Sequence, residues 1–169
     1  LKLPHAELLI NTTSNPERAW NINKIRDRDV TLISSKLTAT KLRDLYHRAD
    51  CFIFPSKGEA DIGLTTLEAM ATGAPVIATD WLFRESDYPP YYYPLRSEVK
   101  KASYLNEYWG DCGDFAYPDI EHLKELMTHV YSNRPEAYES GRKMSEWVHT
   151  NRSWENTIEG VYDVLRRES

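Results

Sequence analysis

The chain has 169 residues, of which 41% are hydrophobic and 28% charged, a composition typical of one globular domain and not of a disordered chain. Its formal net charge of −5 argues against nucleic-acid binding as the main task, because neutralising phosphates requires a basic surface. No apolar run approaches the roughly 20 residues of a membrane-spanning helix, and no signal peptide is visible. With only two cysteines in addition, we expect a cytoplasmic protein. Cys51 is expected to pack as a small hydrophobe.

Four short apolar runs in the first half of the chain predict strands, at residues 6–11, 30–34, 51–55 and 75–79. None alternates cleanly between apolar and polar residues, which is typical of strands buried on both faces. Such strands form parallel sheets covered by helices. We expect a short fifth strand near Phe115 to join the same sheet.

Helical patterns alternate with these runs. After residue 40, apolar residues recur at the spacing of an α-helix. Thr38 or Thr40 is the expected N-cap of this helix. Residues 65–73 begin with Thr and end with Gly, which are usual start and stop signals of a helix. The alternation of strands and helices predicts an α/β fold.

Residues 80–113 follow neither period and are rich in Tyr and Pro. Because a long connection with so many aromatic residues is seldom disordered, we expect an ordered excursion. The tyrosines at 91–93 could stack on an acceptor sugar or pack the excursion onto the domain. Residues 119–168 predict three helices, with Pro135 in the first turn of the second and Ser153 capping the third.

The densest pattern covers residues 54–80 and predicts a strand, a loop, a short helix, a turn and a strand. In open parallel sheets, ligands bind where a loop leaves the carboxyl end of a strand and enters a helix. Gly63 allows the backbone to approach a ligand closely. The free N–H groups near Leu64, Thr65 and Thr66 are therefore expected to face an anion such as a diphosphate.

Glu68 is expected in the first turn of the helix that follows this loop. Its carboxylate could accept hydrogen bonds from vicinal ribose hydroxyls, or it could merely complement the helix dipole. Neither interpretation is excluded by the spacing alone. No carboxylate pair has metal-site spacing, and His122 and His129, seven residues apart, fit the flanks of an apolar helix face better than a metal site.

Residues 54–80 resemble the signature of the family-4-type retaining glycosyltransferases, which have the GT-B fold. The matching residues are Pro55, Ser56, Glu59, Gly63, Leu64, Leu67, Glu68, Ala69, Met70, Ala71, Gly73, Pro75, Val76, Ile77 and Ala78. Residues 42–54, 113–133 and 153–165 are similar to the elements that precede and follow the signature. The resemblance therefore covers most of the chain from about Val30 onward.

The resemblance implies the nucleotide-sugar-binding, C-terminal half of a GT-B enzyme, with a Rossmann-like parallel sheet, helices on both faces and a helical C-terminal third. It implies that Glu68 binds the donor ribose and that Glu59, the candidate catalytic residue, holds the donor sugar. The loop and helix start at Gly63, Leu64 and Thr65 would line the diphosphate.

The implied reaction transfers a sugar, with retention, from a nucleoside diphosphate to an acceptor hydroxyl, without a metal or another cofactor. Residues 1–169 would form one donor-binding domain that is incomplete at its N-terminus and inactive alone. The expected partners are a nucleotide sugar, a carbohydrate or other hydroxyl acceptor, and a separate N-terminal acceptor domain.

The chain departs from the family pattern in three places. Eight residues separate Glu59 from Glu68 where the family has seven, so that the loop bulges by one residue or Asp61 substitutes for Glu59. The usual Phe is Ile62, and the usual Pro is Thr65. These departures bear on sugar specificity and activity, and hardly on the fold.

The family's upstream strand and helix supply an Arg and a Lys to the diphosphate, and the resemblance begins too late to include them. Lys57 and Lys36 are candidate partial substitutes. Two alternatives stay open: another GT-B enzyme, such as a sugar-nucleotide epimerase or a phosphorylase, and a non-catalytic nucleotide-sugar-binding or scaffold domain.

Overall fold

The computed structural model describes residues 3–12, 29–58, 63–83, 90–102, 110–111 and 113–167. The chain divides into two compact units, Leu1–Asp44 and Leu45–Ser169. The whole segment 54–80, which resembles the glycosyltransferase signature, therefore belongs to the second unit, together with the three C-terminal helices.

The first unit contains two parallel strands, β1 (Leu8–Asn11) and β2 (Val30–Ile33), paired from Leu8↔Val30 to Asn11↔Ile33. α2 (Ala39–Arg48) follows β2 and extends into the second unit. Thr38 caps it, since its Oγ1 accepts a hydrogen bond from Lys41 N at 3.4 Å and its carbonyl begins the helical bonding. Of the two expected caps, Thr38 is confirmed.

The second unit is built on a parallel sheet of three strands in the order β3 (Phe52–Phe54), β4 (Val76–Thr79) and β5 (Tyr93–Leu95). The register pairs Phe52 with Val76, and Ile77 with Tyr93. Every residue of β4 is buried, as expected for an apolar run in the middle of a sheet covered on both faces.

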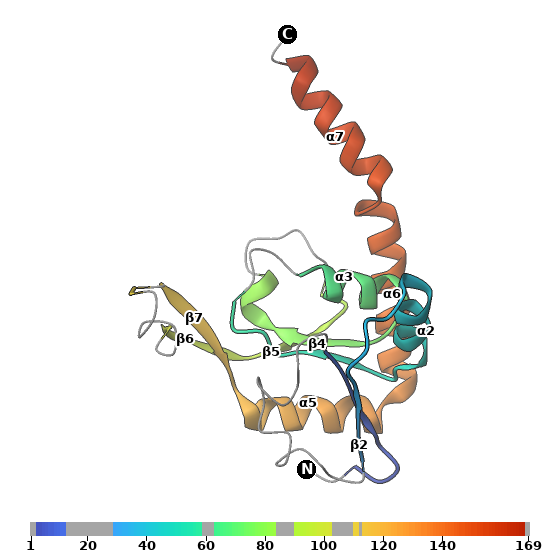
Figure 1. Cartoon of the computed structure of the whole chain (residues 1–169), viewed down its shortest axis with the longest axis vertical. Helices are drawn as coiled ribbons and strands as arrows, with labels where there is room; N and C mark the ends of the chain where they lie inside the picture. Colours follow the sequence, from blue (N-terminus) through green and yellow to red (C-terminus); the bar gives the residue numbers. More distant parts are fainter. Residues whose placement is uncertain are drawn as a thin grey trace. The chain divides into compact units, whose positions relative to one another are not determined.

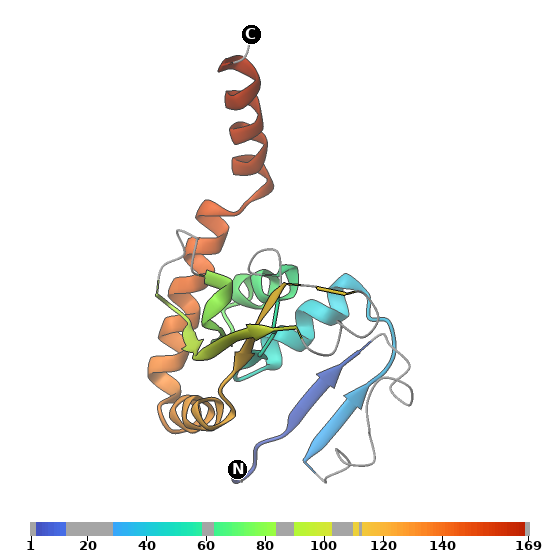
Figure 2. The same ribbon diagram turned by 90° about the vertical axis from the view of Figure 1, so that its left-hand side faces the viewer.

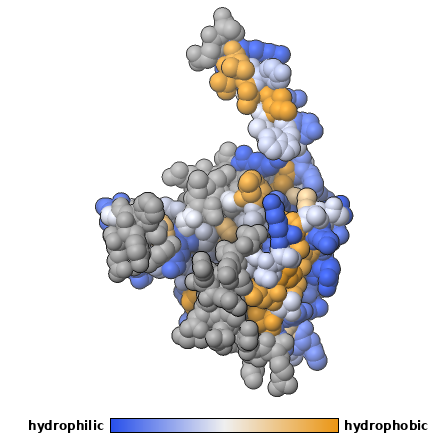
Figure 3. All heavy atoms as spheres, viewed as in Figure 1, coloured by the Kyte–Doolittle hydropathy of each residue, from blue (hydrophilic) through white to orange (hydrophobic). Residues whose placement is uncertain are grey.

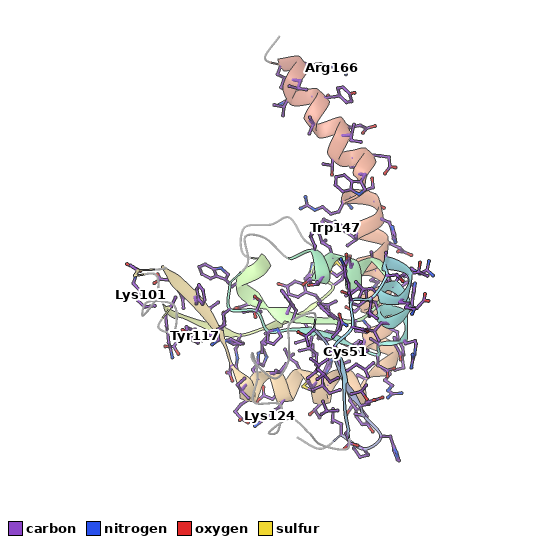
Figure 4. The ribbon with its side chains drawn as sticks, viewed as in Figure 1. Cys51, Lys101, Tyr117, Lys124, Trp147 and Arg166 are labelled. Carbon is purple, nitrogen blue, oxygen red and sulfur yellow. The ribbon has the colours of Figure 1, made fainter. Side chains whose placement is uncertain are left out.

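Helices cover both faces of this sheet: α3 (Leu64–Ala71) lies on one and α5 (Ile120–Ser132) on the other (Figure 1). The core between the sheet and α5 is apolar. Its members are Ile77, Leu95, Val130 and Ala137, with Cys51, Ile53, Tyr93, Leu123, Leu126 and Met127 packed against them. Burial raises the pKa of the Cys51 thiol to about 12, so Cys51 is the small hydrophobe that was expected (Figure 4). The α/β fold with a helical C-terminal part is confirmed.

α6 (Arg134–Asn151), with Pro135 in its first turn, packs closely against α3 and the turn that follows it. Gly141 makes this contact possible, because a Cβ at this position would lie 2.2 Å from Gly73 O. Ser145 Oγ donates a hydrogen bond of 2.7 Å to Ala71 O, one of the last carbonyls of α3. α6 thereby closes the C-terminal end of α3.

α7 (Trp154–Arg167) begins at the expected cap, Ser153, whose Oγ accepts a hydrogen bond from Asn156 N at 3.2 Å. None of its residues is buried, and Figures 1 and 2 show it leading away from the sheet. Its apolar side chains lie exposed along the helix (Figure 3). They are Trp154, Ile158, Val161, Tyr162, Val164 and Leu165.

The region from residue 80 to 113 contains more regular structure than its sequence indicates. η2 (Asp80–Phe83) and β5 belong to it, and β6 (Ser97–Lys101) pairs antiparallel with β7 (Asp114–Pro118). The expectation that the strand near Phe115 joins the parallel sheet is therefore wrong. β7 instead pairs with β6. β6 is mostly exposed and polar, and no apolar run in the sequence predicts it.

Candidate functional site

The loop after β3 is held by hydrogen bonds from two strands, β4 and β7. Thr79 Oγ1, at the end of β4, donates a hydrogen bond of 2.8 Å to Ser56 O, and Ala116 N of β7 donates one of 2.8 Å to Lys57 O. Gly58 packs against the Phe115 ring, which would lie 3.7 Å from an added Cβ. β7 therefore supports the loop that begins the signature, a role that its sequence did not indicate.

Lys57 belongs to this loop, and its Nζ lies 4.5 Å from the centroid of the Tyr117 ring, a cation–π contact with β7. Lys36 follows β2 and is exposed. That either lysine replaces the family's basic residues stays a prediction.

α3 begins at Gly63, which is its N-cap with φ 81° and ψ 132°. This conformation is nearly restricted to glycine, and a Cβ would lie 3.3 Å from the Phe54 ring. Among the described residues no side chain caps the helix, and its first turn contains no acidic residue. Leu64 and Thr65 are exposed, so the N-terminal N–H groups of α3 lie at the surface, where an anion could bind them.

Thr66 is fully buried in the first turn of α3. Its Oγ1 has no hydrogen-bond partner among the described residues and lies 3.7 Å from the position of a Cβ on Gly63. Leaving a buried hydroxyl unpaired costs about 1–3 kcal/mol, so such groups in folded proteins call for a partner. The atom is buried from solvent, so a ligand at the surface beside Gly63 does not reach it in this conformation.

Glu68 is the fifth residue of α3, in the second turn, and the expectation that it lies in the first turn is wrong. The helix begins one residue before the Thr-Thr pair that was expected to start it, because Gly63 is the cap. Since helix-dipole effects fade beyond the first turn, this position disfavours the dipole interpretation of Glu68. Its side chain is exposed, and Tyr46 Oη donates a hydrogen bond of 3.3 Å to Glu68 Oε2.

Tyr46, in α2, was not singled out from the sequence, because it belongs to the apolar face of its helix. It is 8% exposed, and its ring meets Phe52 edge-on with the centroids 5.6 Å apart. Burial, and then the Glu68 carboxylate, raise the pKa of Tyr46 to about 12, so that the phenol stays protonated and donates.

Five of the seven candidate residues thus lie on one short helix and its cap, with Tyr46 beside Glu68. They are Gly63, Leu64, Thr65, Thr66 and Glu68. The other two candidate residues, Glu59 and Asp61, lie outside the described residues, and their roles stay predictions.

The tyrosines at 91–93 have different surroundings. Tyr93 lies in β5 and packs against the core. Burial, and then Asp80, raise the pKa of Tyr92 to about 12. Tyr91 is 37% exposed, with Lys143 Nζ 5.9 Å from its ring centroid. Packing onto the domain therefore accounts for Tyr92 and Tyr93.

Neither histidine considered above has the surroundings of a metal ligand. His122 Nδ1 accepts a hydrogen bond of 3.0 Å from Arg96 N, and His129 packs against Tyr93 with ring centroids 5.6 Å apart. Among the described residues, no group of three or more His, Cys, Asp or Glu could hold a metal ion, and no helix is long and apolar enough to cross a membrane.

A wide depression of about 550 Å³ lies along α5, on the other face of the sheet from α3. None of the candidate donor-binding residues lines it. Its lining residues are Glu121, Lys124, Glu125, Thr128, His129, Ser132 and Asn133.

A parallel sheet with helices on both faces and an exposed helix N-terminus after a strand is typical of a Rossmann-like domain. Residues 2–87, about half of the chain, match the family described as Glycosyl transferases group 1. The chain belongs to this family. The match begins well before Val30, where the resemblance was expected to start.

Two similar proteins agree with this assignment. Over 41 residues the chain is 54% identical to the lipopolysaccharide core biosynthesis mannosyltransferase LpsB of Rhizobium meliloti (strain 1021), an alignment that covers 24% of this chain and 11% of that protein. The fold is similar to sucrose-phosphate synthase from Thermosynechococcus elongatus, with a TM-score of 0.69 and 22% identity, over 99% of this chain and 40% of that one. The chain therefore spans less than half the length of either protein.

Proposed function

We propose that this chain is the donor-binding half of a retaining glycosyltransferase that moves a sugar from a nucleoside diphosphate to an acceptor hydroxyl. Family membership supports sugar transfer in general. The names of the two similar proteins, a mannosyltransferase and a sucrose-phosphate synthase, favour a hexose as the transferred sugar. The arrangement along α3 is the observation that carries the assignment of the donor half.

In this proposal the donor diphosphate binds at the N-terminus of α3. There the backbone N–H groups of Leu64 and Thr65 would donate hydrogen bonds to the phosphate oxygens. Glu68 lies four residues after Leu64, about one helical turn or roughly 5.4 Å further along the helix. A carboxylate at that distance from the phosphates is placed to accept hydrogen bonds from the ribose hydroxyls.

Catalysis would then rest on orienting the donor and stabilising the leaving diphosphate, with no metal or other cofactor. The open end of α3 supplies partial positive charge where negative charge develops as the glycosidic bond breaks. Glu59, or Asp61 if the loop register differs, would hold the donor sugar.

A separate N-terminal domain would bind the acceptor and present its hydroxyl. We also propose that the protein is cytoplasmic. This chain spans only a small share of both similar proteins, which supports the assignment of donor binding and acceptor binding to two different domains. A donor half of this kind binds nucleotide but performs no transfer by itself.

The test is a calorimetric titration of the chain with UDP, GDP and ADP and with their hexose conjugates, repeated with Glu68→Gln. Glu68→Gln keeps the shape of the side chain and removes its charge. A charge-assisted hydrogen bond contributes about 1.5–3 kcal/mol, so we expect affinity for the preferred nucleotide to fall roughly tenfold or more. Glu125→Gln, on the exposed surface of α5, is the matched control and should leave binding unchanged.

Equal affinity of the wild type and Glu68→Gln would refute the assignment of Glu68 to the ribose. The spacing of eight residues between Glu59 and Glu68 favours a second candidate, a domain that binds nucleotide sugars without catalysis. An assay for transfer or donor hydrolysis, with the acceptor domain present, separates the two: nucleotide binding without turnover supports the non-catalytic domain.

A further inference from the structure

Tyr46 keeps a buried hydroxyl where packing alone requires only a ring. Its contact with Phe52 is edge-on, at 5.6 Å between centroids, and Phe52 stacks in turn on Phe54 at 6.1 Å. A phenylalanine would make the same contacts without placing a polar atom at a buried position. A buried hydroxyl is unfavourable unless it is hydrogen-bonded, and the partner of this one is Glu68 Oε2 at 3.3 Å.

Glu68, in contrast, is exposed, and an exposed glutamate side chain can adopt several rotamers. The hydrogen bond from Tyr46 favours one of them, because Tyr46 is itself held by burial in α2. The bond uses Oε2 and leaves Oε1 for another donor. The protonated phenol can only donate to the carboxylate, so the direction of this hydrogen bond is fixed at neutral pH.

We propose that Tyr46 is a positioning residue of the donor site, whose hydroxyl orients the Glu68 carboxylate so that Oε1 faces the ribose hydroxyls of the nucleotide. This inference rests on the proposed function, in which Glu68 binds the ribose. Tyr46 touches the carboxylate and not the nucleotide, so its effect on binding passes through Glu68 alone.

The experiment measures the affinities of UDP and GDP and of their 2′,3′-dideoxy analogues for the full chain by calorimetry. Tyr46→Phe removes the hydroxyl and keeps the ring. A net hydrogen bond corresponds to a roughly two- to tenfold change in affinity, so we expect Tyr46→Phe to weaken the ribonucleotide by that factor. Binding of the dideoxy analogue, which has no hydroxyls for Glu68, should not change.

Two further variants isolate the mechanism. In a Glu68→Ala background, Tyr46→Phe should cause no additional loss, because the group that it positions is absent. Tyr138→Phe is the matched control: it removes a phenol hydroxyl that donates to the carboxylate of Asp50 and not to Glu68, and should leave both affinities unchanged.

Equal losses for the ribonucleotide and its dideoxy analogue would overturn the inference, as would losses from Tyr46→Phe and Glu68→Ala that simply add. A Tyr46→Phe chain that no longer unfolds cooperatively would also overturn it, because the hydroxyl would then serve the fold. If Glu68→Ala weakens the ribonucleotide and Tyr46→Phe does not, only this inference fails. If Glu68→Ala has no effect on ribonucleotide binding, the assignment of Glu68 to the ribose fails with it, and if the wild type binds none of UDP, GDP and ADP, the proposed function fails as well.

Discussion

Replacing Gly141 with alanine tests the packing of α6 against α3. The new methyl group would lie 2.2 Å from Gly73 O and 3.0 Å from both Gly73 C and Pro75 N. All three are backbone atoms, which cannot rotate aside as the end of a side chain can. α6 must therefore move by about 1 Å to restore ordinary van der Waals contact at this position.

The expected loss of folding free energy comes from overpacking and from a weakened hydrogen bond. Overpacking typically costs about 1–3 kcal/mol, and a contact with rigid backbone belongs at the upper end of that range. The shift also weakens the 2.7 Å hydrogen bond from Ser145 Oγ to Ala71 O, which is worth about 1 kcal/mol. Alanine favours a helix over glycine by about 1 kcal/mol, so the net destabilisation should be about 2–3 kcal/mol.

Thermal and urea unfolding followed by circular dichroism measure this loss. A loss of 1 kcal/mol lowers Tm by about 2–4 °C in a chain of this size, so Gly141→Ala should lower it by roughly 4–12 °C. Gly160→Ala in α7 is the matched control, because its methyl group meets no atom within 4 Å and should stabilise the helix slightly. If both variants raise the stability, α6 does not pack against the Gly73 turn in solution.

Two further predictions concern other positions. Gly63→Ala should destabilise the chain by about 1–3 kcal/mol, because alanine is strained at φ 81°, and should weaken nucleotide binding in the same titration; an unchanged Tm would contradict the strained N-cap. Asp119 caps α5 by accepting hydrogen bonds of 3.0 Å from Glu121 N and His122 N, and the bond from His122 N is the largest of the effects that lower its pKa in the folded state. Its stabilising contribution is therefore complete above the unfolded pKa of about 3.9 and is lost as the pH falls through the lower folded pKa. Asp119→Asn keeps a capping side chain that does not titrate, so its free energy of unfolding should fall less steeply than that of the wild type below about pH 4, as measured by urea unfolding; parallel curves would show that Asp119 is not the titrating group.

The sequence predicted the strands of the parallel sheet where burial on both faces leaves a continuous apolar run, as in the fully buried β4. It missed β5 and β6. β5 is three residues long and contains Pro94, and β6 has one apolar residue among its five. Strands of this kind are defined by pairing with a neighbour, which no local pattern records.

The candidate site was predicted in part. Gly63, Thr66 and Glu68 were identified because one short segment contains them all, and the start of α3 was misplaced because Gly63, not a threonine, is the cap. The contact between Tyr46 and Glu68 joins residues 22 apart on different helices. Only the packing of α2 against β3 and α3 creates it, so local spacing could not have predicted it.

The asymmetry of α3 bears on what can vary in the proposed donor site and what cannot. Its C-terminal end is closed by Ser145 of α6, while its first turn contains no acidic residue and no side chain in the described part of the chain caps it. The proposed phosphate and ribose contacts are spaced by the pitch of one rigid helix and lie within the single unit Leu45–Ser169. If a separate domain binds the acceptor, as proposed, its movement would alter the approach of the acceptor, while the distance between the two proposed nucleotide contacts stays constant. Selectivity for the nucleotide and selectivity for the acceptor can thus change independently, through substitutions in different parts of the protein.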